Sequence, residues 1–398
     1  MAAQQQGQMP QGAQIPLQNF KIPQFPPQAN SLKSLTLTSE IKLDDYQNLL
    51  KETHSIPPLP YSIESLTLEL FSLGYPAGFL IELARKLPNV KSLVFFSQLL
   101  GGLTDEGSDD VVALFKYMRG LRGLHLLDVF AKPGLIERIA PFVIYDTDEQ
   151  SGRRGLMFLE VNYTTQQGDD EVLSKVPAKE LPKLIGPGLI TLAFNASEAE
   201  DDENEAGAAP RQGLGKEGVM TFNKSLSANL VKALSDDDGR PQGLRVLNTT
   251  LYTLTFGDLK TILTKQTGLM VLMVTLEIDG SESCRKQLLE ILSEHGQRLE
   301  QAEIVVSPSM QFFVEVRISF FLAVCIIPKL TTDSQLDQAP SKTMERAFPS
   351  ESDLETLSMK CTKLNSFKAN VLRSARFQEI GWEKKDEKWS GGVKTGGS

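Results

Sequence analysis

The sequence predicts an α/β repeat array in which short parallel strands alternate with helices. The first observation is a recurring triplet, in which the first, fourth and sixth residues are apolar. Its ten copies are Leu32-Leu35-Leu37, Ile63-Leu66-Leu68, Val90-Leu93-Phe95, Leu124-Leu127-Val129, Leu156-Leu159-Val161, Leu189-Leu192-Phe194, Leu244-Leu247-Thr249, Leu269-Leu272-Val274, Leu299-Ala302-Ile304 and Leu364-Phe367-Ala369. The second observation is the spacing. Seven of the nine intervals between copies are 25 to 34 residues long, which suits one strand, one helix and two connections.

The third observation is helical periodicity between the triplets. In residues 77–87 the apolar side chains of Phe79, Leu83 and Leu87 recur at helical spacing. Five copies of the triplet also follow a glycine, which suits a helix C-cap just before a strand. These glycines are Gly123, Gly155, Gly188, Gly243 and Gly268.

A single strand–helix repeat cannot cover its own apolar triplet. Stacking the repeats in parallel buries the triplets against the helices, so the pattern predicts a solenoid with a parallel sheet on the concave face and helices on the convex face. Leu159 and Leu192, at the fourth position of their repeats, are then expected to be buried. An ordinary α/β domain with parallel strands remains the alternative.

The triplet pattern resembles the leucine-rich-repeat superfamily, and the longer repeats resemble the ribonuclease-inhibitor-like and F-box-associated types. The resemblance covers residues 31–375. It implies a parallel sheet that binds a protein partner. The ninth position of each repeat departs from the family pattern, because it holds neither Asn nor Cys. Residues 1–60 hold one helix-like stretch, at residues 44–52, and do not resemble an F-box.

Composition predicts where the array begins, ends and is interrupted. Residues 1–30 are rich in Gln and Pro, so we expect a disordered tail there, and a second disordered tail at residues 384–398. Insertions are expected at residues 196–218, which contain an acidic run, and at residues 316–349. The apolar stretch within residues 316–335 breaks the helix–strand order, which leaves two interpretations open: genuine protein, or a translated retained intron.

Charge and composition exclude several classes of partner. The 398-residue chain carries a formal net charge of −9, which argues against nucleic acid or an anionic membrane surface as the main partner. The longest apolar run, residues 318–327, is about half of what a membrane span needs. Three cysteines without a CxxC pair favour neither a disulfide framework nor a zinc site. Without a signal peptide, we expect a cytoplasmic or nuclear protein, not a secreted one.

Motifs for catalysis, metal binding or cofactors are weak. Gly213-Leu-Gly-Lys-Glu-Gly218 matches GxGxxG, but an acidic linker precedes it instead of a strand. His54, His125 and His295 are scattered and lack ligand spacing. Asp109 and Asp110 are expected to cap the start of their own helix. We therefore expect no catalytic residue, no metal and no cofactor.

The outward positions of three repeats predict the candidate binding surface. The third, fifth and seventh residues of each repeat point away from the core, and in repeats three to five they include large apolar groups among charges. The predicted partner-binding residues are Val94, Phe96, Leu126, Asp128, Phe130, Phe158, Glu160 and Asn162. A second register in the fourth repeat, Leu121-Leu124-Leu126, would instead turn Gly123, His125 and Leu127 outward, and Leu126 and Phe130 inward.

Three functional hypotheses follow from this pattern. The leading one is a non-catalytic scaffold that binds an unknown protein partner through the concave face. The second is a substrate-recognition subunit of a ubiquitin ligase without a recognisable F-box. The third is an enzyme whose active-site residues are dispersed in the sequence.

Overall fold

A computed structural model of the protein describes residues 12–144, 155–165, 176–198, 224–308, 345–371 and 378–395. The chain divides into two compact units. Met1–Thr165 and Glu171–Thr191 form unit 1, and Gln166–Asp170 and Leu192–Ser398 form unit 2. Each unit is α/β, with a mostly parallel sheet and helices, so the predicted fold class is confirmed at this level.

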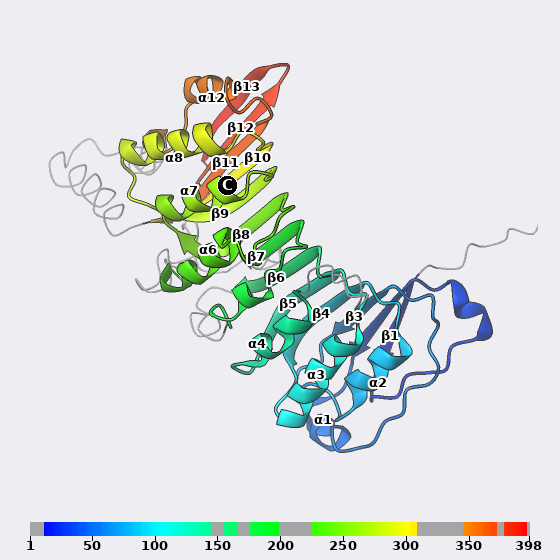
Figure 1. The fold of residues 1–398 in the computed structure, drawn as a ribbon. Coiled ribbons are helices and arrows are strands. Elements are labelled where there is room, and N and C mark those ends of the chain that lie inside the picture. The colour runs from blue at the N-terminus through cyan, green and yellow to red at the C-terminus, as the bar shows by residue number, and fades with distance from the viewer. Residues whose placement is uncertain are drawn as a thin grey trace, which may run out of the picture. The chain divides into compact units, whose positions relative to one another are not determined.

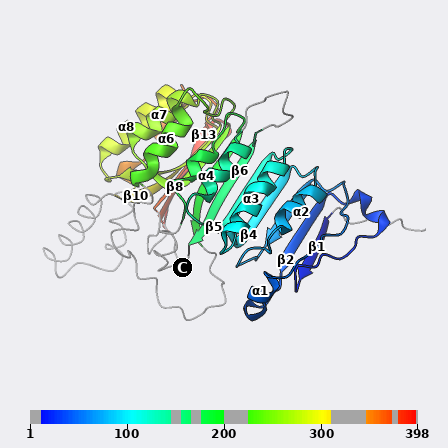
Figure 2. The same cartoon turned by 60° about the horizontal axis from the view of Figure 1, so that its bottom comes forward.

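The strands of unit 1 pair in the order in which they occur in the chain, and every pairing is parallel. They are β1 (Gly12–Leu17), β2 (Ser34–Ser39), β3 (Ser65–Glu69), β4 (Ser92–Leu100), β5 (Gly123–Ala131) and β6 (Phe158–Thr165). The α-helices are α1 (Leu43–Leu49), α2 (Phe79–Lys86), α3 (Asp105–Tyr117) and α4 (Leu135–Ile139). Figures 1 and 2 show α2, α3 and α4 side by side along one face of these strands.

The apolar triplets form the core of unit 1 in register. Strand pairing aligns one row of fourth-position residues, and all of them are buried because the sheet alternates side chains between its two faces. This row is Leu35, Leu66, Leu93, Leu124 and Leu159. The next core row is Leu37, Leu68, Phe95, Leu126 and Val161. The predicted burial of Leu159 is confirmed, and that of Leu192 in unit 2 is confirmed as well.

The register predicted first for the fourth repeat is wrong. Leu124 aligns with Leu93, and Leu126 aligns with Phe95, so the buried triplet is Leu121-Leu124-Leu126. Leu126 is only 1% exposed, and Leu127 lies on the opposite face. The sequence permits both registers because a three-residue shift places an apolar residue at all three positions either way: Leu121, Leu124 and Leu126, or Leu124, Leu127 and Val129.

The N-terminal segment corrects a second prediction. Within residues 1–30, which were expected to be disordered, residues 12–17 form β1 and pair with β2. Phe20 is fully buried, and its ring lies 5.8 Å from that of Tyr46 and 5.5 Å from that of Phe79. Few apolar residues are enough to order this segment, because the backbone of β1 pairs with β2 and the Phe20 side chain packs in an aromatic cluster.

Unit 2 repeats the same construction. Its strands are β7 (Thr191–Glu198, which begins at the unit boundary), β8 (Val246–Leu254), β9 (Val271–Ile278), β10 (Gln301–Pro308), β11 (Ser366–Val371), β12 (Gln378–Lys385) and β13 (Lys388–Thr395). Its α-helices are α6 (Ser227–Ser235), α7 (Phe256–Lys265), α8 (Glu282–His295) and α12 (Glu351–Ser358). β8 to β11 pair in parallel, and pairing aligns the buried row Leu247, Leu272, Ala302 and Phe367.

The C-terminal prediction is also corrected. Residues 384–398 were expected to be a disordered tail, but β12 and β13 form an antiparallel hairpin that pairs with β11. The indole N–H of Trp389 donates a hydrogen bond to the Ser358 hydroxyl of α12 at 2.9 Å, and Trp389 is buried. The polar composition of this segment reflects a hairpin that buries only one of its faces.

Most of the two predicted insertions lies outside the described residues. Residues 199–223 and 309–344 are not among the described residues. The stretch 316–335, with its retained-intron interpretation, and the GxGxxG sequence at residues 213–218 therefore lie outside them as well. Ala347 and Phe348, which follow the second gap, are buried. None of the helices in the described ranges is long and apolar enough to cross a membrane.

Side chains from one repeat hold the helix ends of the repeat before it. Asp110, expected to cap its own helix, lies inside α3 and accepts hydrogen bonds from Leu80 N–H and Ile81 N–H in the first turn of α2, at 2.8 and 3.0 Å. Thr104 caps α3 instead, accepting from Gly107 N–H. Glu180 accepts from Gly134 N–H, at the start of α4, at 2.7 Å.

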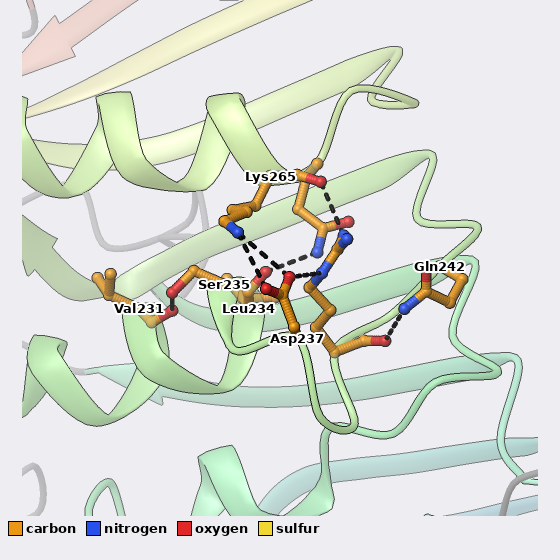
Figure 3. Close-up of polar contacts among 8 residues, drawn as sticks. Val231, Leu234, Ser235, Asp237, Gln242 and Lys265 are labelled. Carbon is orange, nitrogen blue, oxygen red and sulfur yellow. Dashed lines mark hydrogen bonds and ion pairs between the residues drawn. The ribbon is translucent and has the colours of Figure 1, made fainter.

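Figure 3 shows the equivalent arrangement in unit 2, at the C-terminal end of α6. The Gln266 amide, just after α7, donates to the Leu234 carbonyl at 2.6 Å. Lys265 contacts the Asp237 carboxylate at 3.2 Å, and the hydrogen bond and charge of Lys265 lower the pKa of Asp237. Neighbouring repeats are therefore joined by directed polar contacts as well as by apolar packing.

Candidate interaction surface

Three neighbouring strands of unit 1 present a regular grid of side chains opposite the core. Because side chains alternate along a strand, the neighbours of buried Leu93 and Phe95 face the other side of the sheet, which we name the open face. Pairing between β4, β5 and β6 aligns three rows there. The rows are Ser92–Gly123–Phe158, Val94–His125–Glu160 and Phe96–Leu127–Asn162.

The apolar members of this grid stay accessible. Phe96 is 37% exposed and Phe158 is 45% exposed, whereas Val94 and Leu127 are half-buried. The helices α2, α3 and α4 lie on the opposite side, with the core rows. Two phenyl rings on this sheet are therefore left in contact with solvent. Burial of their exposed apolar area would be energetically favourable.

One hydrogen-bonded pair lies in the middle row. His125 Nδ1 is 2.8 Å from Glu160 Oε2, and both side chains are about a third exposed. This contact fixes the imidazole and the carboxylate between the two phenyl groups. It gives the apolar surface a polar centre of defined geometry.

A second group of charges lies where the strands begin. Lys33 and Lys91, just before β2 and β4, both contact the Glu64 carboxylate, at 2.8 and 2.7 Å. Hydrogen bonds from Lys33 and then Lys91 lower the pKa of Glu64 to about 2. Glu64 therefore stays ionised at neutral pH, and two lysines against one carboxylate leave this group of charges positive.

The regular grid ends at three neighbouring residues whose backbone is in the left-handed conformation. Leu70, Ser97 and Asp128 have φ values of 62°, 49° and 53°, and they occupy equivalent positions in consecutive repeats. The Asp128 carboxylate accepts a hydrogen bond from Thr164 N–H at 2.5 Å, which ties β5 to β6 beyond this point. A residue with positive φ shifts the alternation of the strand, so side chains beyond it no longer follow the grid.

The eight predicted residues therefore separate into two sets. Five of them lie in the grid on the open face: Val94, Phe96, Phe158, Glu160 and Asn162. Leu126 is core, Asp128 is the left-handed residue, and Phe130 is half-buried with its ring 5.5 Å from that of Tyr163. His125 and Leu127 belong to the grid but were missed by the first register; the second register identifies them.

The other two histidines have contacts elsewhere in the described residues. His54 Nε2 contacts the Leu49 carbonyl at 3.1 Å, and His295 lies beside Thr264 and Glu294 in unit 2. Within the described ranges, no group of three or more His, Cys, Asp or Glu residues is placed to hold a metal ion.

Comparison with known proteins adds no assignment. Neither the protein-family models nor the curated proteins contain a match to this chain.

Proposed function

We propose that this protein is a non-catalytic interaction module that binds a protein partner through the open face of unit 1. One observation carries the proposal: Phe96 and Phe158 remain 37% and 45% exposed on one face of the sheet, with Val94 and Leu127 next to Phe96. Aromatic side chains contribute much of the binding energy of protein interfaces and lose little entropy on binding when their backbone is fixed.

The repeat pattern supports the same function. The aligned core rows and the helices on one side are what a leucine-rich-repeat array would have, and we propose that the repeats are of this type. In such an array the strands form a continuous surface for a partner. We further propose that the protein works in the cytoplasm or nucleus, where the free, buried Cys284 and Cys361 would remain reduced.

The test replaces the two exposed rings together. A Phe96→Ser/Phe158→Ser double variant should keep the melting temperature of the parent protein, because both side chains lie outside the core. It should capture a crosslinked partner from cell extract at least about 30-fold less strongly, as expected when interface aromatics are lost.

The matched control replaces Tyr61 and Leu103, which are 73% and 58% exposed and lie outside the grid. A Tyr61→Ser/Leu103→Ser variant removes two large side chains that are more exposed than Phe96 and Phe158, and it should still capture the partner normally. The proposal fails if both double variants behave alike, or if the Phe96/Phe158 variant folds normally and retains its partner.

A further inference from the structure

One edge of unit 1 gathers positive charge. It is formed where α2 leads into β4, at residues 85–92, and where α3 leads into β5, at residues 116–123. We name these two segments the basic edge. Together they contain six cations and no carboxylate. The cations are Arg85, Lys86, Lys91, Lys116, Arg119 and Arg122.

Contacts of backbone and side chains hold the two segments side by side. The Arg122 and Gly123 N–H groups donate to the Lys91 carbonyl at 2.7 and 2.9 Å. On the neighbouring helices α2 and α3, the Arg85 guanidinium lies 5.1 Å from the centre of the Tyr117 ring and donates to its hydroxyl at 3.2 Å. The cations of two repeats are therefore brought to one place on the surface.

Few carboxylates of the described residues compensate this charge. Lys91 shares the Glu64 carboxylate with Lys33, at 2.7 and 2.8 Å. Lys86 and Arg119 have no carboxylate of the described residues within ion-pair distance, and Arg119 is exposed. Because like charges that lie close together repel one another, binding of an anion at this edge would be favourable.

The helix ends alone do not explain the basic edge. Cations near a helix C-terminus complement the helix dipole, which accounts for those in the last turns of α2 and α3. It does not account for Lys91, Arg119 and Arg122, which lie beyond these helices. The equivalent connection in unit 2, residues 235–246, contains three aspartates and two arginines. A helix-to-strand connection of this fold therefore does not require a purely basic sequence.

We propose that the basic edge binds an acidic segment of a partner protein through the carboxylates of that segment. The planar guanidinium of Arg85 is oriented by Tyr117 and has further N–H donors, which suit a carboxylate that accepts two parallel hydrogen bonds. Lys86 and Arg119, in the same two segments, can pair with further carboxylates. The basic edge uses none of the residues of the open face.

The charge of the rest of the chain favours a short anion over a long one. The whole chain carries a formal net charge of −9 although the basic edge contributes only positive charges, so the other residues are more negative still. A nucleic acid duplex or an anionic membrane extends well beyond two repeats and would be repelled by those residues. A short acidic segment can stay within the basic edge.

Binding of a defined acidic peptide to the full chain tests this surface. The probe is a rhodamine-labelled oligoglutamate with blocked ends and one glutamate for each of the six cations. Fluorescence anisotropy at low ionic strength gives its Kd. Lys86→Gln/Arg119→Gln should bind the probe at least about fivefold more weakly than the parent protein and keep its melting temperature. Arg119→Gln alone should weaken binding about twofold, and it serves if the double variant does not fold.

The matched control removes the same charge from unit 2. Lys232 lies in the last turn of α6, Lys363 lies just before β11, and both are exposed. Lys232→Gln/Lys363→Gln should bind the probe as the parent protein does, because only the total charge changes and not the basic edge.

Three further probes decide the chemistry of the occupant. An oligoglutamine of the same length and label should not bind. A DNA duplex of about three helical turns and vesicles that contain phosphatidylserine should both bind more weakly than the acidic peptide. The proposal is wrong if the parent protein does not bind the acidic peptide, if oligoglutamine binds equally, or if both double variants lose affinity alike. Tighter binding of the duplex or of the vesicles overturns it in favour of nucleic acid or membrane.

Discussion

The carboxylate of Asp110, on α3, accepts a hydrogen bond from the backbone N–H of Leu80, in the first turn of α2, at 2.8 Å. Its second oxygen accepts from Ile81 N–H at 3.0 Å. These N–H groups have no partner within α2, as at the start of any helix. The cap of one helix is therefore supplied by the following repeat instead of by the residue that precedes the helix.

Replacement of Asp110 should lower the stability of unit 1, although Asp110 belongs to none of the apolar triplets. Asp110→Ala leaves two backbone amides of α2 without their acceptor, which is destabilising. It also removes the cost of burying a carboxylate, the same burial that raises the pKa of Asp110, and this partly offsets the loss. The net loss of unfolding free energy should be about 1–2 kcal/mol. Urea denaturation followed by circular dichroism measures it. Glu106→Ala, exposed in the same helix, is the control, and equal effects of the two changes would contradict the capping role.

Glu64 should make stability depend on pH in a defined direction. The pKa of Glu64 is lowered to about 2, so its contribution to stability is fully present above the ordinary value of about 4.3 and is lost as pH falls toward 2. The difference in unfolding free energy between the parent protein and Glu64→Gln should therefore be constant near neutral pH and shrink below about pH 4.3. Because the group is solvent-exposed, added salt should also shrink it. A difference that grows on acidification would contradict this assignment.

The register of β5 can be tested with two adjacent leucines. Leu126→Ala removes a fully buried side chain and should cost about 2–5 kcal/mol of unfolding free energy. Leu127→Ala, on the half-buried open face, should cost less than about 1 kcal/mol. Thermal or urea denaturation of the two variants under identical conditions gives the comparison. The reverse order of effects would restore the register Leu124-Leu127-Val129.

Phe20 tests whether the N-terminal segment belongs to the folded core. Its ring packs in a cluster with Tyr46, Phe71 and Phe79, so Phe20→Ala should cost about 3–5 kcal/mol. Hydrogen exchange should at the same time accelerate at the β2 amides that pair with β1. Gln24→Ala, exposed four residues later, is the control. No change in either measurement would mean that residues 12–22 do not stabilise unit 1.

The periodic parts of the chain could be predicted from sequence because burial there depends on local pattern. Nine of the ten triplets lie in the core as expected. The fourth failed because Leu121, Leu124, Leu126 and Leu127 satisfy two registers, and the choice depends on tertiary pairing with β4. The strands β1, β12 and β13 were missed because their stability comes from neighbours already in place, which no local pattern records.

The candidate surface was predictable to the extent that the register was. Phe96 and Phe158 follow from alternation along β4 and β6. The contact between His125 and Glu160 could not be foreseen, because 35 residues separate them and only strand pairing brings them together.

The cap that Asp110 places on α2 bears on how such a chain can gain or lose length. Glu180 at Gly134 and Gln266 at Leu234 follow the same rule, so part of the information that delimits a helix is stored in the next repeat. A gene duplication or deletion that cuts cleanly between two triplets would still separate a helix from its cap. A viable duplication should therefore include the capping side chain from the following repeat together with the helix that it caps. Engineered arrays should likewise be recombined as overlapping pairs of repeats and not as single repeats.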